Sequence, residues 1–217
     1  MPDGDQRSPL APPPPGEAPR LGRSARFCRG VLRLYFLRVC GARLVELQEP
    51  QRAFIISMNH RSALDMFLYV AIFERPIRFL AKAELFRIPV LGAVLRRWAI
   101  PIQRGTPDRS ALREAEAVLD RGFAVSVFPQ GHRSRALGPG HGGAVYLAAR
   151  TGAPVLPGAI TGRYRPVGHL AVRAAPLLWV PSSADRQARR QASLDLMASI
   201  RAMAGEVATA AGKGAAS

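Results

Sequence analysis

The chain is 217 residues long and carries a formal net charge of +16, with 48% hydrophobic and 21% charged residues. A chain of this length forms one domain with a sizeable core, and its excess of Lys and Arg predicts attraction to polyanions such as lipid headgroups, phosphorylated substrates or nucleic acid. Its two cysteines, Cys28 and Cys40, exclude a zinc-finger pattern and argue against a disulfide framework. No apolar run approaches the roughly 18 residues of a membrane-spanning helix, and the first residues do not resemble a signal peptide. We therefore expect a cytosolic chain or one that lies on a membrane surface.

The two ends of the chain differ from its body. Residues 1–22 are rich in Pro, Gly and charged residues, which predicts a disordered tail. Residues 27–47 mix apolar and basic residues in a pattern typical of an amphipathic helix, so residues 23–48 are predicted as a basic helical segment. Such a helix either lies in a lipid interface or packs on the domain with its arginines in solvent. Residues 206–217 are predicted as an Ala-rich, fraying tail.

The body, residues 49–205, alternates short β-branched runs with longer amphipathic runs, which predict strands and helices respectively. The predicted strands cover residues 53–58, 78–81, 99–103, 123–128, 154–160 and 169–174. The predicted helices cover residues 62–73, 89–98, 108–120, 144–150 and 185–211. This alternation predicts a single α/β domain with a mixed, largely parallel sheet flanked by helices.

Polar side chains follow the first predicted strand of the body directly. Asn59 and His60 come at its carboxyl end, where α/β folds place their sites, and Asp65 follows five residues after His60. If His60 lies in the turn before the next helix and Asp65 in the first helical turn, the carboxylate can orient the imidazole for general base catalysis. The alternative is structural, with Asp65 serving only as a helix cap. This segment alone leaves both interpretations open.

Two further segments follow predicted strands in the same way. Arg104 directly follows the strand at residues 99–103, and the strand at residues 123–128 leads into a Gly-rich loop that contains Gly131, Arg133 and Ser134. If these strands are parallel, both arginines and His60 lie at one edge of the sheet. A cationic pocket beside a general base suits an acceptor alcohol that carries a phosphate.

Four motifs, in order along the chain, resemble those of the glycerolipid acyltransferases, a family that includes the lysophosphatidic acid acyltransferases. They are Asn-His with four residues before Asp, an Arg before a small residue, Phe-Pro-Glu-Gly-Thr-Arg-Ser, and a Pro-Val-x-Pro strand. The matching residues are Asn59, His60 and Asp65, then Arg104, then Phe128, Pro129, Gly131, Arg133 and Ser134, and finally Pro154, Val155 and Pro157. The resemblance covers roughly residues 27–205.

The resemblance implies an O-acyltransferase in which His60 is the general base and Asp65 orients it. The residues implied to bind the substrate are Asn59, Arg104, Phe128, Pro129, Gln130, Gly131, Arg133 and Ser134. The implied acceptor is a lysophospholipid, in particular 1-acylglycerol-3-phosphate, and the donor is acyl-CoA or acyl-carrier protein. No bound cofactor and no metal are implied. We expect a peripheral or monotopic protein at the cytoplasmic face of an anionic membrane, without a transmembrane helix.

The chain departs from the third motif at two positions, because Gln130 replaces Glu and His132 replaces Thr. Gln keeps a carbonyl acceptor but loses the negative charge, which leaves open a different lysolipid acceptor such as an amino-acid lipid. A catalytically inert, basic membrane-binding protein is the other alternative. Nucleic acid is not an expected partner, because no helix-turn-helix, zinc-finger or aromatic RNA-binding signature accompanies the charge.

Overall fold

The computed structural model describes residues 19, 22–103, 108–130, 142–166 and 168–213. A seven-stranded sheet forms its centre, with the strand order β1-β7-β6-β2-β5-β3-β4. The strands are β1 Arg43–Val45, β2 Ile55–Met58, β3 Ile77–Lys82, β4 Ala99–Ile102, β5 Ala124–Ser126, β6 Val155–Thr161 and β7 Ala171–Ala174. β6 and β7 pair antiparallel, whereas the other neighbours pair parallel. The predicted mixed, largely parallel sheet is confirmed.

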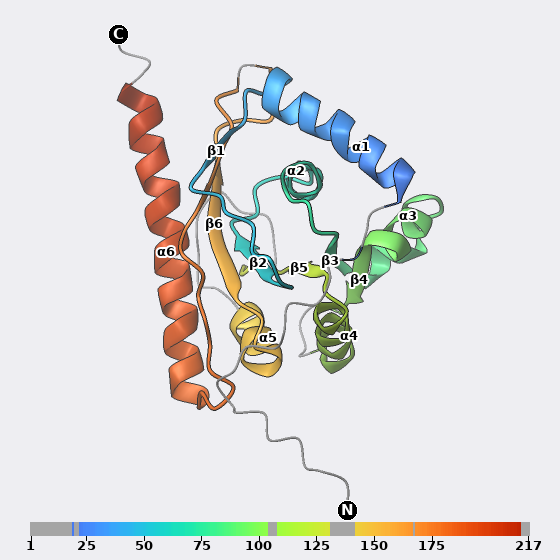
Figure 1. The fold of residues 1–217 in the computed structure, drawn as a ribbon, viewed down its shortest axis with the longest axis vertical. Helices are drawn as coiled ribbons and strands as arrows, with labels where there is room; N and C mark the ends of the chain where they lie inside the picture. The colour runs from blue at the N-terminus through green and yellow to red at the C-terminus, as the bar shows by residue number, and fades with distance from the viewer. Residues whose placement is uncertain (1–18, 20–21, 104–107, 131–141, 167, 214–217) are drawn as a thin grey trace, which may run out of the picture.

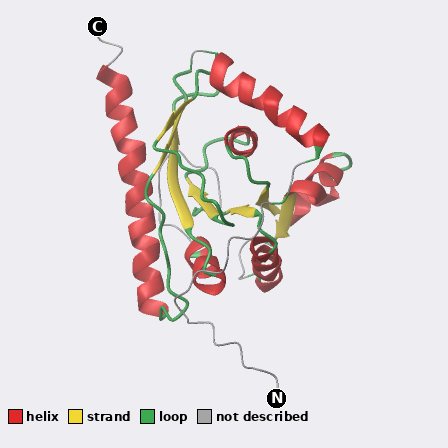
Figure 2. Ribbon diagram, in the orientation of Figure 1, coloured by secondary structure: helices red, strands yellow, loops and turns green. Residues whose placement is uncertain are grey.

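Helices cover both faces of this sheet (Figures 1 and 2). They are α1 Arg23–Leu34, α2 Leu64–Ile72, α3 Leu91–Trp98, α4 Arg109–Asp120, α5 Gly143–Thr151 and α6 Arg186–Lys213. α1 and α2 lie over one face, while α4, α5 and α6 lie over the other (Figure 1). A π-helical turn, Tyr35–Val39, continues α1, and a 3₁₀ helix, Ala83–Arg87, follows β3.

Two apolar layers join the helices to the sheet. The layer beneath α1 and α2 is rich in aromatic rings, which include Phe36, Phe54, Tyr69, Phe73 and Phe79. The layer on the opposite face uses smaller side chains, among them Ala111, Val118, Ala148, Val155 and Ile200. All four residues of β2 are buried, as expected of a central strand covered on both faces. β2 is therefore a rigid base for the residues at its carboxyl end.

The N-terminal segment differs from the prediction of one helix over residues 27–47. α1 ends at Leu34, the π-helical turn ends at Val39, and Gly41 then adopts a φ of +64°, which favours glycine. The chain continues into β1, which pairs parallel with β7 at one edge of the sheet. The helix prediction was thus wrong after residue 39, because the three residues of β1 carry no strand pattern and are recruited by pairing with β7. The predicted tail at residues 1–22 falls almost wholly outside the described residues.

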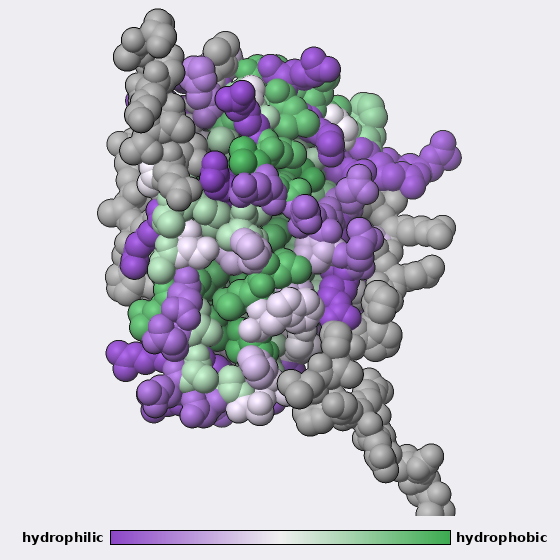
Figure 3. Space-filling view, turned by 60° about the vertical axis from the view of Figure 1, so that its left-hand side comes forward, coloured by the Kyte–Doolittle hydropathy of each residue, from purple (hydrophilic) through white to green (hydrophobic). Residues whose placement is uncertain are grey.

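α6 has 28 residues and extends to Lys213, slightly beyond the predicted residue 211. Leu196, Met197, Ile200 and Met203 are buried side chains of α6 in the second apolar layer, whereas Leu194 is exposed. Figure 3 brings the α6 side of the molecule forward and shows a band of apolar side chains between hydrophilic ones. The helix therefore packs as part of the domain, against β6, β7 and α5.

The N-cap of α4 fixes the exit from β4. The Asp108 carboxylate accepts hydrogen bonds from the backbone N–H of Ser110 and Ala111, both at 3.0 Å, and from Gln103 N–H at 2.9 Å. These bonds, the one from Gln103 above all, lower the pKa of Asp108 from 3.8 to about 2. Asp108 thus joins the end of β4 to the start of α4 across the segment that contains Arg104.

We expect Asp108→Ala to lower the free energy of unfolding by about 1 kcal/mol at pH 7, the usual effect of removing an N-cap. Because the pKa is lower in the folded protein, the stabilisation by Asp108 is present above pH 3.8 and is lost as the pH falls towards 2. The difference between wild type and variant in urea unfolding should therefore shrink over this window. Asp120→Ala, at the opposite end of α4, is the control and should leave stability unchanged or slightly higher. An equal loss in both variants would contradict the capping role.

Candidate active site

His60 and Asp65 meet at the carboxyl end of β2. The strand ends at Met58 and α2 begins at Leu64, so His60 lies in the connecting turn and Asp65 in the first helical turn. His60 Nδ1 lies 2.7 Å from Asp65 Oδ2. This is the arrangement that the five-residue spacing required if the two side chains were to meet.

Asp65 also holds the backbone of the turn. Its Oδ2 accepts hydrogen bonds from Arg61 N–H at 2.7 Å and from Ser62 N–H at 2.9 Å, and the residue is fully buried. Asp65 therefore orients the histidine and holds the turn before α2, but it does not cap the first amides of α2 itself. One oxygen atom accepts from two amides at the entrance of α2 and from the imidazole.

The protonation of the imidazole follows from these bonds. Oδ2 accepts from two amides that can only donate, so it acts as an acceptor for His60 as well and Nδ1 carries the hydrogen. The neutral ring then has its lone pair at Nε2. The His60 side chain is 13% exposed, so the ring is mostly enclosed while the carboxylate behind it is not exposed at all. The pair can accept a proton at Nε2 and stabilise the resulting positive charge through Asp65.

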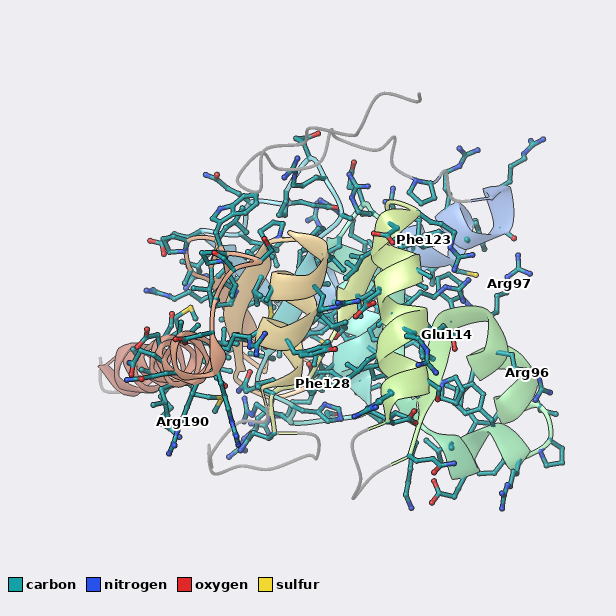
Figure 4. All side chains as sticks on the ribbon, turned by 90° about the horizontal axis from the view of Figure 1, so that it is seen from below. Arg96, Arg97, Glu114, Phe123, Phe128 and Arg190 are labelled. Carbon is teal, nitrogen blue, oxygen red and sulfur yellow. The ribbon has the colours of Figure 1, made fainter. Side chains whose placement is uncertain are left out.

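Phe128 fixes the plane of the imidazole. Its ring stacks on His60 with a centroid distance of 3.8 Å and an interplanar angle of 18°. Phe123 and Phe128 flank β5, and Figure 4 shows them at opposite edges of the sheet, so Phe128 marks the carboxyl edge. Pro129 and Gln130 follow and are both buried. The third motif thus supplies the neighbouring wall of the site.

Asn59 ties the site to β6. Its side-chain Nδ2 donates to the carbonyl oxygen of Ile160 at 2.9 Å, and its Oδ1 accepts from Ile160 N–H at 2.7 Å. Both groups of the amide are therefore engaged by one backbone position of the adjacent parallel strand. This pairing holds the start of the His60 turn against the sheet.

A tyrosine that sequence reasoning missed completes the surroundings of Asp65. The hydroxyl of Tyr164 donates to Asp65 Oδ1 at 2.5 Å from the connection between β6 and β7. Burial, reinforced by the Asp65 charge, raises the pKa of Tyr164 far above its ordinary value, so the hydroxyl keeps its proton. No local pattern in the sequence singles out Tyr164, because 99 residues separate it from Asp65.

Four of the predicted site residues, Arg104, Gly131, Arg133 and Ser134, lie outside the described residues. The strands that lead to them are described, and β4 and β5 belong to the same parallel set as β2. Their carboxyl ends therefore share one edge of the sheet. β5 is adjacent to β2, whereas β4 lies three strands away, about 14 Å at the usual strand spacing.

Within the residues that the structure describes, no group of His, Cys, Asp and Glu side chains could hold a metal ion. The same residues include no helix that is long and apolar enough to cross a bilayer. Among the described residues at this edge, the group suited to proton transfer is the oriented His60, with its carboxylate and tyrosine behind it.

A largely parallel α/β sheet with a His–Asp pair at its carboxyl edge, and with a Phe-Pro motif beside it, defines the class of protein as an acyltransferase domain. The family model described as Acyltransferase matches residues 42–161, more than half of the chain. The chain belongs to this family.

The individual relatives are named after the same enzymatic activity. The chain is 34% identical over 117 residues to a chloroplastic 1-acyl-sn-glycerol-3-phosphate acyltransferase of Brassica napus, covering 51% of this chain and 34% of the relative. It is 29% identical over 141 residues to the 1-acyl-sn-glycerol-3-phosphate acyltransferase of Bacillus subtilis, covering 63% of this chain and 71% of the relative. The crystal structure of the 1-acyl-sn-glycerophosphate acyltransferase PlsC from Thermotoga maritima shares the fold. Its TM-score is 0.60 at 24% identity, with coverage of 82% of this chain and 78% of the other.

Proposed function

We propose that this chain transfers a fatty acyl group from a thioester donor to the free hydroxyl of 1-acylglycerol-3-phosphate, which yields phosphatidic acid. The observation that carries the proposal is the His60–Asp65 pair, with Nδ1 bonded at 2.7 Å and the basic nitrogen Nε2 on the other side of the ring. The names of the relatives from Brassica napus and Bacillus subtilis support this acceptor.

The reaction needs first a base and then an acid, and one imidazole can act as both. Nε2 of His60 accepts the proton of the acceptor hydroxyl as its oxygen attacks the thioester carbonyl. Asp65 stabilises the imidazolium that forms. The C–O bond forms, the C–S bond breaks, and the imidazolium returns the proton to the departing thiolate. No nucleophile from the protein is required, and the donor is acyl-CoA or acyl-carrier protein.

The phosphate of the acceptor needs cations near the same edge. Arg133 follows β5, directly beside β2, and Arg104 follows β4 further along. Guanidinium groups bind phosphate oxygens in a bidentate manner, which suits both residues to this role. Gln130, which is buried at the start of the same loop, adds no negative charge that would oppose the phosphate.

Purified protein should be assayed with labelled acyl-CoA and with acyl-carrier protein against a panel of lysolipids. The panel contains lysophosphatidic acid, lysophosphatidylcholine and a mono-acylated amino-acid lipid. We expect product with lysophosphatidic acid at a kcat/KM at least tenfold above that for the others. A preference for the amino-acid lipid would change the acceptor and keep the reaction. No transfer to any acceptor, from either donor, would contradict the enzymatic function and favour the inert membrane-binding alternative.

We also propose that the chain works as a peripheral or monotopic protein at the cytoplasmic face of an anionic membrane. No residue of α1 is buried, and Phe27, Val31 and Leu34 are 73%, 53% and 63% exposed. These three positions form one stripe along the helix, with Arg26 and Arg33 along one side of it. An apolar stripe beside arginines suits insertion among anionic headgroups.

A second exposed apolar segment lies on the same side of the molecule and supports the proposal that this side binds the membrane. Ile88, Val90 and Leu91 are exposed at the start of α3. α3 lies near the N-terminal end of α1 in both Figure 1 and Figure 4. Arg96 and Arg97 project outward from α3 in Figure 4 and extend the positive charge on this side.

The variant Phe27→Ser/Val31→Ser/Leu34→Ser tests this surface. If half of the burial free energy of these side chains is realised in the membrane, its loss amounts to about 3 kcal/mol, or about 100-fold in vesicle partitioning. Sedimentation with phosphatidylglycerol vesicles measures it. Leu194→Ser, which changes an exposed leucine on α6, is the matched control and should bind as wild type does. Equal binding by the triple variant and wild type would exclude α1 as the anchor.

A further inference from the structure

The carboxylate of Asp65 has two oxygens with different partners. Oδ2 accepts from His60 and from two backbone amides, whereas Oδ1 accepts from the hydroxyl of Tyr164. Tyr164 belongs to none of the four motifs, and it lies three residues beyond the segment that the family model matches. The fully buried carboxylate is thus held from the opposite side by a residue from a distant part of the chain.

We propose that Tyr164 is a positioning residue for acyl transfer, which holds the Asp65 carboxylate in the one orientation that fixes the His60 imidazole. The inference rests on the proposed function, and it adds a third member to the His60–Asp65 pair. Tyr164 acts through Asp65 rather than on the substrate.

The backbone that carries Tyr164 is held in place by its surroundings. Gly162 has a φ of +80°, and a Cβ atom there would lie 2.1 Å from the carbonyl oxygen of His169, so the chain turns tightly at this point. Arg61 donates through Nη1 to the carbonyl oxygen of Gly162 at 2.9 Å. The residue that follows His60 therefore binds the same connection that delivers the tyrosine.

The ring of Tyr164 is fixed as well. Phe36, which is buried in the π-helical turn after α1, packs against it edge-on with a centroid distance of 6.0 Å. A ring held by such packing places its hydroxyl with little rotational freedom. Phe36, Tyr164, Asp65 and His60 thus form a continuous chain of contacts from the N-terminal segment to the imidazole.

A second tyrosine near Asp65 provides the contrast. Tyr69 is fully buried, and among the described residues its hydroxyl has no hydrogen-bond partner. Burial and the Asp65 charge raise the pKa of both tyrosines, so both stay protonated at neutral pH. The two residues therefore share ring type and proximity to the carboxylate. They differ in burial, since Tyr164 is only partly buried, and in whether the hydroxyl is bonded to the carboxylate.

Removing the Tyr164 hydroxyl would leave Oδ1 buried without its donor. The carboxylate would then rotate or recruit water to satisfy this oxygen, and both responses loosen its bond to His60 Nδ1. The imidazole would populate its other tautomer, in which Nε2 carries the hydrogen and cannot accept a proton. The rate of the chemical step should fall, while binding of the acceptor should not change.

The test compares Tyr164→Phe with Tyr69→Phe. We expect Tyr164→Phe to lower kcat about tenfold, the effect of one lost hydrogen bond, with KM for lysophosphatidic acid within twofold of wild type. Tyr69→Phe should leave both constants unchanged. In protein labelled with ¹⁵N-histidine, the Nδ1 and Nε2 signals of His60, identified by their loss in His60→Ala, should move in Tyr164→Phe alone.

The ¹⁵N measurement decides the inference independently of activity. If the His60 signals keep their wild-type positions in Tyr164→Phe, the positioning role is wrong even where acyl transfer is confirmed. If the signals move but no acceptor is acylated by wild-type protein, Tyr164 does position His60 and the proposed function fails instead. Equal loss of kcat in the two variants would also overturn the proposal, because it would indicate a general effect of the missing hydroxyl on the core.

Discussion

Replacing His60 with alanine is expected to lower kcat for acyl transfer by about 10²- to 10⁴-fold, the range of a general base. The imidazole is the group in the described site with a lone pair placed to accept a proton, because Asp65 engages Nδ1 and leaves Nε2 basic. KM for the acceptor should change little, since the proposed phosphate-binding residues remain. Product formation from labelled acyl-CoA and lysophosphatidic acid measures the effect.

His169→Asn is the matched control for this experiment. His169 is exposed and has a φ of +51°, a conformation that asparagine tolerates, so the replacement should preserve the fold. Its kcat should equal that of wild type. Retention of more than a tenth of wild-type kcat in His60→Ala, with the fold intact, would mean that another group removes the proton.

The fold and the His–Asp pair followed from local signals. β2 is an apolar run buried on both faces, and a polar turn and a largely apolar helix follow it. The order of these segments along the chain was sufficient to place His60 and Asp65. The pairing of parallel strands then followed from the alternation of elements. Sequence alone therefore predicted at which edge of the sheet His60 and Asp65 meet.

Other features depend on contacts between distant segments. β1 has three residues and no strand pattern, and it forms because β7 offers it hydrogen bonds. Tyr164 lies in a connection between strands, where no periodicity distinguishes a site residue from a solvent-exposed one. The Asn59 amide is engaged by Ile160, 101 residues away, a contact that only the register of β2 and β6 could reveal, and the predicted role of Asn59 in substrate binding stays a prediction.

Replacing Asp65 with asparagine separates the charge of this residue from its geometry. Three donors surround Oδ2, so the asparagine must place its carbonyl oxygen there and its NH₂ group towards Tyr164. The tyrosine hydroxyl can reverse its role and accept from this NH₂ group. The hydrogen bonds of the turn and the tautomer of His60 are then preserved, while the negative charge that stabilises the imidazolium is lost.

We therefore expect Asp65→Asn to lower kcat about 10³-fold, within the range of general-base catalysis, with a stability close to that of wild type. Asp65→Ala should lose similar activity and also about 2–4 kcal/mol of unfolding free energy, because the partly buried amides of Arg61 and Ser62 lose their acceptor. Single-turnover acyl transfer and urea unfolding of both variants separate the two effects. If Asp65→Asn is as active as wild type, the carboxylate only holds the turn before α2 and its charge has no part in the reaction. If the two variants unfold at the same urea concentration, the amides of the turn do not depend on this side chain, and the rigidity of the His60 turn has another source.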